Sequence, residues 1–201
     1  MQKVPYAQSI GALNWLSLTT RPDIAYAVSC CAQFISNPGQ EHWKQVKRIF
    51  GYLKNTNDLK LCYDANANEI EGYTDADFGG DTDTRRSTSG YLYDIAGGAV
   101  SWSSKKQSTT AVSTQEAEYV AIEHGSNEAI WISRILKFIN RPLPSTIRIN
   151  SDNEAAIDAV KDPFKKSSLK QVDIRIHTAY DRYSRNEFSI NWVPPFKQNV
   201  R

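Results

Sequence analysis

The sequence predicts an α/β fold in which five strands and several helices follow a small helical element. Three observations support this prediction. Apolar residues recur at helical spacing as far as residue 54, strand-like runs of β-branched and aromatic residues begin at Leu59, and helical spacing returns after Ser113. With 201 residues, 40% of them hydrophobic, the chain has enough apolar material for one substantial core and a small appendage.

The first part of the chain, residues 1–58, is predicted to be helical. Residues 6–19 carry apolar side chains at helical spacing, and Pro22 is well placed to begin a second helix that extends to Ile35. Asn37, Pro38 and Gly39 then end that helix, and residues 41–54 form a third. We place the boundary of the second domain, residues 59–201, where the strand pattern begins.

Three antiparallel strands are expected next. Residues 59–75 are predicted to be extended chain that breaks into a loop at Gly79 and Gly80, so Asp75 falls at or near a strand end. Gly97 and Gly98 stand between two runs rich in Tyr, Val and Trp, which is the signal of a two-residue hairpin turn.

Helices and two more strands complete the domain. Ser113 and Glu116 are spaced as a capping box, and the helix that they begin is expected to run to about Phe138, with a break near Gly125. A strand near Ile147, a short helix at 154–160, a longer helix at 168–183 and a last strand at 188–193 follow. The tryptophans Trp15, Trp43, Trp131 and Trp192 are expected in the core.

Three carboxylates stand in different local settings, and they are the main functional signal. Asp75 follows a strand, Glu118 lies in the first turns of a helix, and Asp152 follows another strand before a helix. If the two strands are neighbours and the helix packs across them, the three converge, and their like charges repel unless cations lie between them. Two Mg²⁺ ions about 4 Å apart resolve that conflict and carry out phosphoryl hydrolysis.

Composition narrows the class of protein. The net charge is +2, but residues 71–160 carry −5 and residues 161–201 carry +5, a distribution that suits metals beside a bound polyanion. We find no apolar run long enough for a membrane span and no signal-peptide pattern. Cys30, Cys31 and Cys62 lack metal-ligand or redox spacing. These properties predict an intracellular protein with reduced cysteines.

Six segments, in this order, resemble the ribonuclease H domain of copia-type retrotransposon polyproteins. They are Tyr73-Thr74-Asp75-Ala76-Asp77-Phe78-Gly79-Gly80-Asp81, Arg85-Arg86-Ser87-Thr88-Ser89-Gly90-Tyr91, Trp102-Ser103-Ser104-Lys105-Lys106-Gln107, Glu116-Ala117-Glu118-Tyr119, Asp152-Asn153 and Val172-Asp173-Ile174-Arg175. Residues 6–63 resemble the end of the reverse transcriptase that precedes this domain.

The resemblance implies a ribonuclease H-like mixed five-stranded sheet flanked by helices. It implies hydrolysis of the RNA strand of RNA/DNA hybrids with two Mg²⁺ ions, or Mn²⁺ in their place. The family's catalytic, metal-binding carboxylates fall on Asp75, Glu118 and Asp152. The expected partners are the hybrid and the reverse transcriptase part of the polyprotein, with no membrane. The expected location is the cytoplasm, in a virus-like particle, or the nucleus.

A second group of residues is predicted to contact the hybrid. Guanidinium, hydroxyl, amide and ammonium donors can hold phosphates, and none of them would read bases. The group consists of Arg85, Arg86, Ser87, Thr88, Lys105, Lys106 and Gln107. The plainer alternative is a charged turn. Asp77, Asp81 and Asp83 only partly offer the oxygen pattern of a calcium loop, so we expect a solvated loop beside the metal site.

The sequence also departs from the family pattern. The family places a fourth carboxylate shortly after the Val-Pro of the last strand, whereas no acidic residue follows Glu187 here, and Gln171 stands where relatives carry His. We therefore expect a C-terminally truncated domain with weakened hydrolysis. Two alternatives remain open: a weakened ribonuclease H, and a catalytically inactive remnant that binds hybrid or packs against a polymerase.

Overall fold

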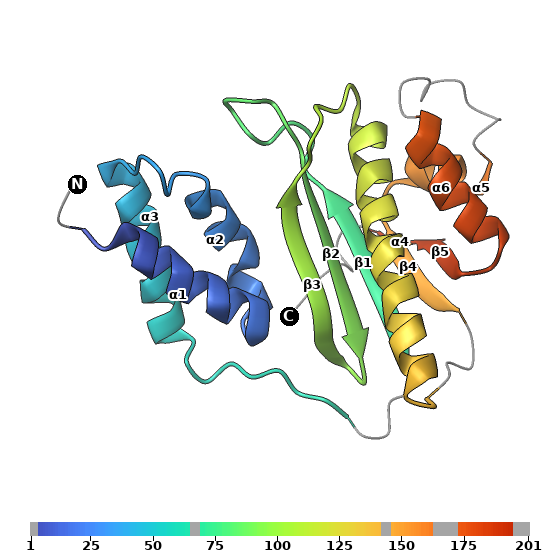
Figure 1. The fold of residues 1–201 in the computed structure, drawn as a ribbon, viewed down its shortest axis with the longest axis horizontal. Coiled ribbons are helices and arrows are strands. Elements are labelled where there is room, and N and C mark those ends of the chain that lie inside the picture. Colours follow the sequence, from blue (N-terminus) through green and yellow to red (C-terminus); the bar gives the residue numbers. More distant parts are fainter. Residues whose placement is uncertain (1–3, 65–68, 142–145, 163–172, 195–201) are drawn as a thin grey trace. The chain divides into compact units, whose positions relative to one another are not determined.

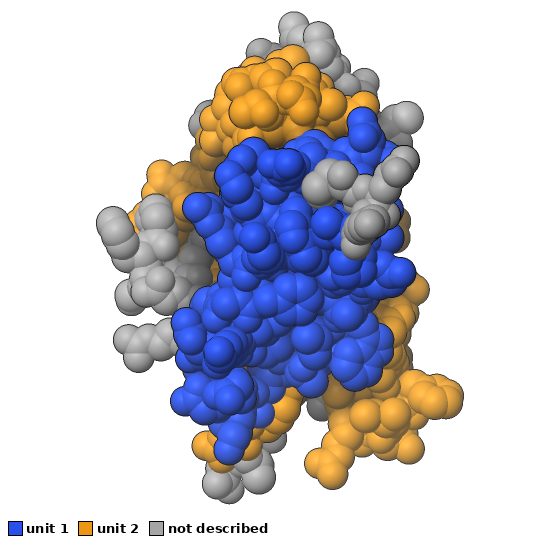
Figure 2. All heavy atoms as spheres, turned by 90° about the vertical axis from the view of Figure 1, so that its left-hand side faces the viewer, with its two compact units in different colours: residues 1–62 blue, residues 63–201 orange. Residues whose placement is uncertain are grey.

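The computed structural model describes residues 4–64, 69–141, 146–162 and 173–194. The chain divides into two compact units, Met1–Cys62 and Tyr63–Arg201. Figure 2 colours the two units separately. In the described ranges, none of the helices combines the length and the apolar character that crossing a membrane requires.

The first unit is helical. It consists of α1 (Tyr6–Thr19), a 3₁₀ turn (Pro22–Ile24), α2 (Ala25–Ala32) and α3 (Gln40–Asn55). The second helix is shorter than predicted, because its first turn is 3₁₀ and the chain turns after Ala32. These helices share a small core, and the Tyr6 hydroxyl donates a hydrogen bond of 2.8 Å to the Cys31 carbonyl within it.

The second unit contains a mixed sheet whose five strands lie in the order β3-β2-β1-β4-β5 (Figure 1). The strands are β1 (Ile70–Ala76), β2 (Thr88–Ile95), β3 (Gly98–Lys106), β4 (Ile147–Ser151) and β5 (Phe188–Trp192). The first three pair antiparallel, whereas β4 pairs parallel with both β1 and β5. The predicted fold class, a mixed five-stranded sheet flanked by helices, is confirmed.

Two details of the antiparallel part differ from the prediction. The hairpin turn falls on Ala96 and Gly97, which both have positive φ, 56° and 76°, as a type I′ turn requires. Gly98 already belongs to β3, so the predicted turn was one residue too late. The strands were also predicted to begin too early, at Leu59. In the structure β1 begins at Ile70, which pairs with Ile95, the last residue of β2.

The helix α4 (Thr114–Phe138) packs mainly on β1 and β2 and is continuous through Gly125, where a break was expected. Its start follows the predicted cap, because the Ser113 hydroxyl accepts a hydrogen bond from the Glu116 amide at 3.1 Å. The Glu116 carboxylate accepts from the Val112 amide. Two more helices, α5 (Glu154–Lys161) and α6 (Asp173–Ser184), pack against α4. The beginning of the predicted helix at 168–183 lies outside the described residues.

The tryptophans contradict the prediction that they are core residues. Trp15, Trp131 and Trp192 are 65%, 55% and 48% exposed, and only Trp43 packs at the edge of a core. Trp131 directly precedes the buried Ile132, so the helical turn of about 100° per residue carries it off the buried face. The main core is formed instead by the aromatic and aliphatic side chains of β2, α4, β4, α5, α6 and β5.

Candidate active site

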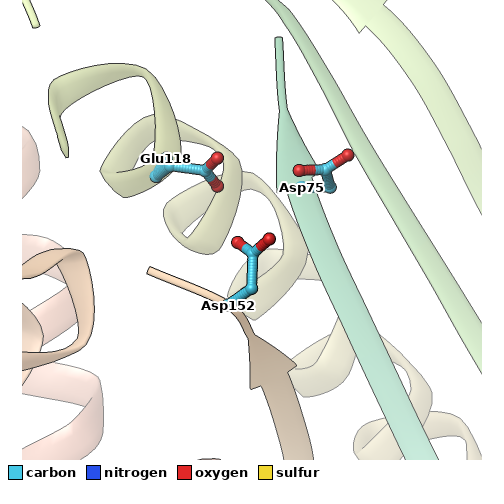
Figure 3. A group of neighbouring side chains, drawn as sticks. All are labelled: Asp75, Glu118 and Asp152. Carbon is cyan, nitrogen blue, oxygen red and sulfur yellow. The ribbon is translucent and has the colours of Figure 1, made fainter. Parts of the chain in front are cut away.

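The three predicted carboxylates lie together at one edge of the sheet. The parallel register pairs Tyr73 of β1 with Asn150 of β4. Asp75, still on β1, and Asp152, directly after the end of β4, each follow this pair by two residues. Glu118 reaches the same place from the second turn of α4. One carboxylate oxygen from each residue lies within 4.8 Å of the other two, and Figure 3 shows the three side chains pointing toward a common space.

Glu118 is the most enclosed of the three. Glu118 is 4% exposed, and its Oε2 atom is buried without a hydrogen-bond partner. Gln107 fixes the helix turn beside it, because its Nε2 donates to the Ala117 carbonyl at 2.9 Å and to the Ser89 hydroxyl at 2.8 Å. A buried carboxylate oxygen without a donor is costly unless the group is protonated or a cation is present.

The electrostatics of the cluster follow from burial and from like charge. Burial, together with the charges of Asp75 and Asp152, raises the pKa of Glu118 to about 8. The pKa of Asp75 is also raised, first by partial loss of hydration and then by the charge of Asp152. The ion pairs among the described residues use other carboxylates, those of Asp23, Glu41, Asp81 and Glu71. The cluster thus concentrates negative charge.

Asp152 and its neighbour Asn153 are each held by a hydrogen bond. The Trp192 indole Nε1 donates a hydrogen bond of 3.0 Å to the Asp152 carbonyl, which ties the residue to the end of β5. Asn153 caps α5 by accepting from the Ala156 amide at 2.9 Å. The sequence analysis placed Trp192 in the core and missed this role, because a contact between residues 152 and 192 leaves no local pattern.

The loop between β1 and β2 is braced by hydrogen bonds. The Asp77 carboxylate accepts from the Thr88 amide, and the Asp77 amide donates to the Thr88 carbonyl at 3.1 Å. The Ser87 hydroxyl accepts from the Gly79 amide at 3.0 Å, and Asp81 forms an ion pair with Lys106 of β3. These contacts therefore hold the loop against the start of β2 and the end of β3.

The predicted nucleic-acid residues fall into two groups. Arg85 and Arg86 at the loop and Lys105 on β3 are exposed, and Lys106 next to it pairs with Asp81. Ser87 and Gln107 are buried and bonded inside the domain, and the amide of Thr88 is held by Asp77. We retain the first group as candidate phosphate contacts. The geometry gives the second group a positioning role.

Among the described residues, the carboxylates of the loop between β1 and β2 do not lie close enough together to share a metal ion. Within the described ranges, the cluster of Asp75, Glu118 and Asp152 is the one group of three or more such side chains close enough to share a metal ion. Asp81 instead accepts hydrogen bonds from Thr84 and pairs with Lys106, and these contacts hold its pKa well below the usual range.

A comparison with curated sequences finds relatives along most of the chain. It is 42% identical over 177 residues to the retrovirus-related Pol polyprotein from transposon TNT 1-94 of Nicotiana tabacum, covering 88% of this chain and 13% of that protein. It is 35% identical over 173 residues to the Pol polyprotein from transposon RE2 of Arabidopsis thaliana, covering 86% of this chain. The chain thus spans about an eighth of these relatives.

One shorter relative is covered nearly completely. The chain is 46% identical over 134 residues to secreted RxLR effector protein 161 of Plasmopara viticola, which amounts to 66% of this chain and 94% of that protein. No family model matches the chain.

One solved structure supports the fold, and a second is similar to part of the chain. The foamy viral protease-reverse transcriptase in complex with an RNA/DNA hybrid aligns with 98% of this chain and 26% of its own, with a TM-score of 0.54 and 15% identity. The structure of LC11-RNase H1 in complex with an RNA/DNA hybrid aligns with 65% of this chain and 89% of its own, with a TM-score of 0.48 and 13% identity.

Proposed function

We propose that the chain is the ribonuclease H of a retrovirus-related Pol polyprotein, because it is 42% and 35% identical to two such polyproteins from transposons along most of its length. Its reaction is the endonucleolytic hydrolysis of the RNA strand in RNA/DNA hybrids. The observation that carries the proposal is the convergence of Asp75, Glu118 and Asp152 from β1, α4 and the end of β4. Residues 1–58 are proposed to be the end of the preceding reverse transcriptase.

The residues of the cluster fit divalent magnesium. They offer hard carboxylate oxygens, which are the ligands that Mg²⁺ takes in proteins, and the bare Oε2 of Glu118 lacks any other partner. Asp75, Glu118 and Asp152 would hold the ions. When bound, two such ions would neutralise the clustered charge, activate water and stabilise the leaving oxygen. Mn²⁺ has the same ligand preference and is the proposed substitute.

Strand pairing, a hydrogen bond and basic side chains of the protein would position the carboxylates and the hybrid. The parallel pairing of β1 and β4 brings Asp75 and Asp152 to the same edge of the sheet, and the Trp192–Asp152 hydrogen bond holds the second of them there. Arg85, Arg86, Lys105 and Lys106 are the proposed contacts to the phosphates of the hybrid, which would lie beside the cluster. Such contacts orient a polyanion without reading its sequence. Selection of the RNA strand would then follow hybrid shape and the 2′-hydroxyl.

The test is cleavage of an end-labelled RNA/DNA hybrid by the purified chain, with Mg²⁺ and with a chelator. The matched control is Asp75→Asn, which keeps the shape of the side chain and removes its charge. We expect Mg²⁺-dependent cleavage of the RNA strand that the variant lacks. Cleavage that persists in Asp75→Asn would reveal a contaminating nuclease, and duplex DNA and single-stranded RNA serve as substrates that should stay intact.

A second candidate function is a non-catalytic module that binds hybrid or packs against a polymerase. It is favoured by one feature of the sequence: Val193 and Pro194 are followed by Pro, Phe, Lys and Gln, where the resemblance implies a fourth carboxylate. In this case the chain binds the hybrid with an affinity that falls as salt rises, but Mg²⁺ leads to no cleavage. A binding assay beside the cleavage assay separates the two functions.

A further inference from the structure

A stripe of small residues on α4 faces the strand that carries Asp75. Ala117, Ala121, Gly125 and Ala129 follow one another at intervals of four, which places them on one face of the helix, and all four are buried. Ala117 and Ala121 share a small cluster with Ala76 of β1. At these positions the helix and the strand therefore approach with little side chain between them.

The contact is tightest at Gly125. A Cβ atom on this residue would lie less than 3.0 Å from Cγ2 of Thr74, a separation that real Cβ atoms essentially never show. Thr74 is 1% exposed and directly precedes Asp75. A methyl group on α4 would therefore push against the residue next to one carboxylate of the cluster.

A hydrogen bond holds the helix at this distance. The Tyr93 hydroxyl donates to the Gly125 carbonyl at 2.8 Å, and the Tyr93 side chain is fully buried. The Tyr93 ring in turn occupies the space that a side chain at Gly72 of β1 would need. Gly72, Tyr93 and Gly125 thus form a continuous contact from β1 through β2 to α4.

We propose that Gly125 is a positioning residue, whose missing side chain lets α4 approach β1 closely enough for Glu118 to reach Asp75 and Asp152. This inference rests on the proposed function, because it concerns the same carboxylates. To regain ordinary contact distances of 3.4–4 Å with an alanine at position 125, Thr74 or α4 must shift. Because Thr74 is 1% exposed in the packed sheet, we expect α4 to move away from β1. Since a helix in a close-packed core shifts as a unit, Glu118, two turns earlier, moves with it.

The experiment uses four variants of the full chain and measures Mg²⁺ affinity by calorimetry. Gly125→Ala introduces the clash, and Thr74→Ser alone removes the methyl group that it meets while keeping the hydroxyl. The double variant Gly125→Ala/Thr74→Ser relieves the clash. Gly51→Ala is the matched control, because Gly51 lies within helix α3 and a Cβ there meets nothing within 4 Å.

We expect Gly125→Ala to weaken Mg²⁺ binding by about 10- to 100-fold, the range typical of residues that support metal ligands. The double variant should return most of the affinity, as expected when two side chains contact each other. Gly51→Ala should bind like the wild type. Thermal unfolding in chelator, followed by circular dichroism, shows whether each variant is folded when its affinity is measured.

The outcomes separate this inference from the proposed function. If the wild type binds Mg²⁺ and a folded Gly125→Ala binds it equally well, Gly125 does not position Glu118, and the proposed function stands. If the double variant is as weak as Gly125→Ala, or if neither folds, the contact with Thr74 is not the cause. If Gly125→Ala fails to fold but the double variant folds and binds, the inference holds. A wild type that binds no Mg²⁺ overturns the proposed function.

Discussion

Two acidic regions lie next to each other in the second unit, and their carboxylates have opposite environments. In the loop between β1 and β2, Asp77 accepts from the Thr88 amide, and Asp81 pairs with Lys106 and accepts from Thr84. In the cluster, Glu118 keeps a buried oxygen without a donor, and its neighbours are the carboxylates of Asp75 and Asp152.

The difference is visible in the pKa values. That of Asp81 is lowered by its ion pair and hydrogen bonds, whereas that of Glu118 is raised to about 8 by burial and like charge. A satisfied carboxylate stabilises the fold in its ionised form, whereas a crowded one destabilises the fold whenever it ionises. The loop therefore has the properties of a structural brace, and the cluster has those of a site that needs a cation.

Glu118→Gln tests the carboxylate cluster and should have the largest effect. The substitution removes the buried charge at constant shape, so we expect Mg²⁺ affinity and hybrid cleavage to fall by at least about 100-fold, the scale of losing a group that stabilises transition-state charge. In chelator at pH 8, the variant should unfold at a higher temperature than the wild type, because no carboxylate has to ionise there. Cleavage and thermal unfolding are measured on the same preparations.

The comparison fails if Glu118→Gln loses stability in chelator and keeps its cleavage rate. The carboxylate would then act as a structural partner, as Asp81 does. The isosteric loop variant Asp77→Asn is the matched control, since it also removes one negative charge from the same edge of the sheet but should keep cleavage within about 10-fold of the wild type.

A pH dependence of stability is the next largest effect. The carboxyl group of Glu118 ionises near 4.5 in the unfolded chain and near 8 in the folded protein. Between these values only the unfolded chain gains the charge, so the free energy of unfolding in chelator should fall as pH rises from about 4.5 to 8. Each unit of difference corresponds to about 1.4 kcal/mol, so the loss is a few kcal/mol at most.

Saturating Mg²⁺ should reduce or reverse this pH dependence, because a bound cation favours the ionised carboxylates. Chemical denaturation at pH 5, 6.5 and 8, with Mg²⁺ and with chelator, measures both slopes. Parallel curves under the two conditions would mean that the cluster does not bind the metal.

Local patterns in the sequence were enough to predict most of the fold. The helix start at Ser113, the three antiparallel strands and the strand at Ile147 all carry signals within a few neighbouring residues. The hairpin turn was misplaced by one residue, because Gly97 and Gly98 look alike in sequence, and only the strand register decides which of them turns. The exposed Trp15 and Trp131 were misread because residue type outweighed their phase on the helix.

The candidate site was predictable in part for the same reason. Asp75, Glu118 and Asp152 each stand at an element boundary that the sequence reveals, and the structure brings them together. Their supports are contacts between distant residues, such as Trp192 with Asp152 and Gly125 with Thr74. Ser87 and Gln107 carry polar groups that suit phosphate binding, and only their burial shows that these groups are used inside the domain.

Asp77→Ala tests the structural side of the comparison and should have a smaller effect. It leaves the Thr88 amide without its carboxylate acceptor, and we expect a loss of about 1–3 kcal/mol in the free energy of unfolding. Asp77→Asn retains an acceptor oxygen and should lose less. Denaturant unfolding in chelator measures both variants. Equal stability of Asp77→Ala and the wild type would show that the hydrogen bond does not brace the loop.

Arg86→Ala should have the smallest effect, because Arg86 is an exposed side chain whose backbone carbonyl, the acceptor for the Asp81 amide, is retained. One lost phosphate contact weakens hybrid binding uniformly across sequences and reduces the slope of log affinity against log salt by about 1. Fluorescence anisotropy with a labelled hybrid in the Asp75→Asn background measures this slope without cleavage. Arg134→Ala, an exposed arginine on the later part of α4, is the matched control. If both variants change the slope equally, the effect comes from net charge, and the loop does not contact the hybrid through Arg86.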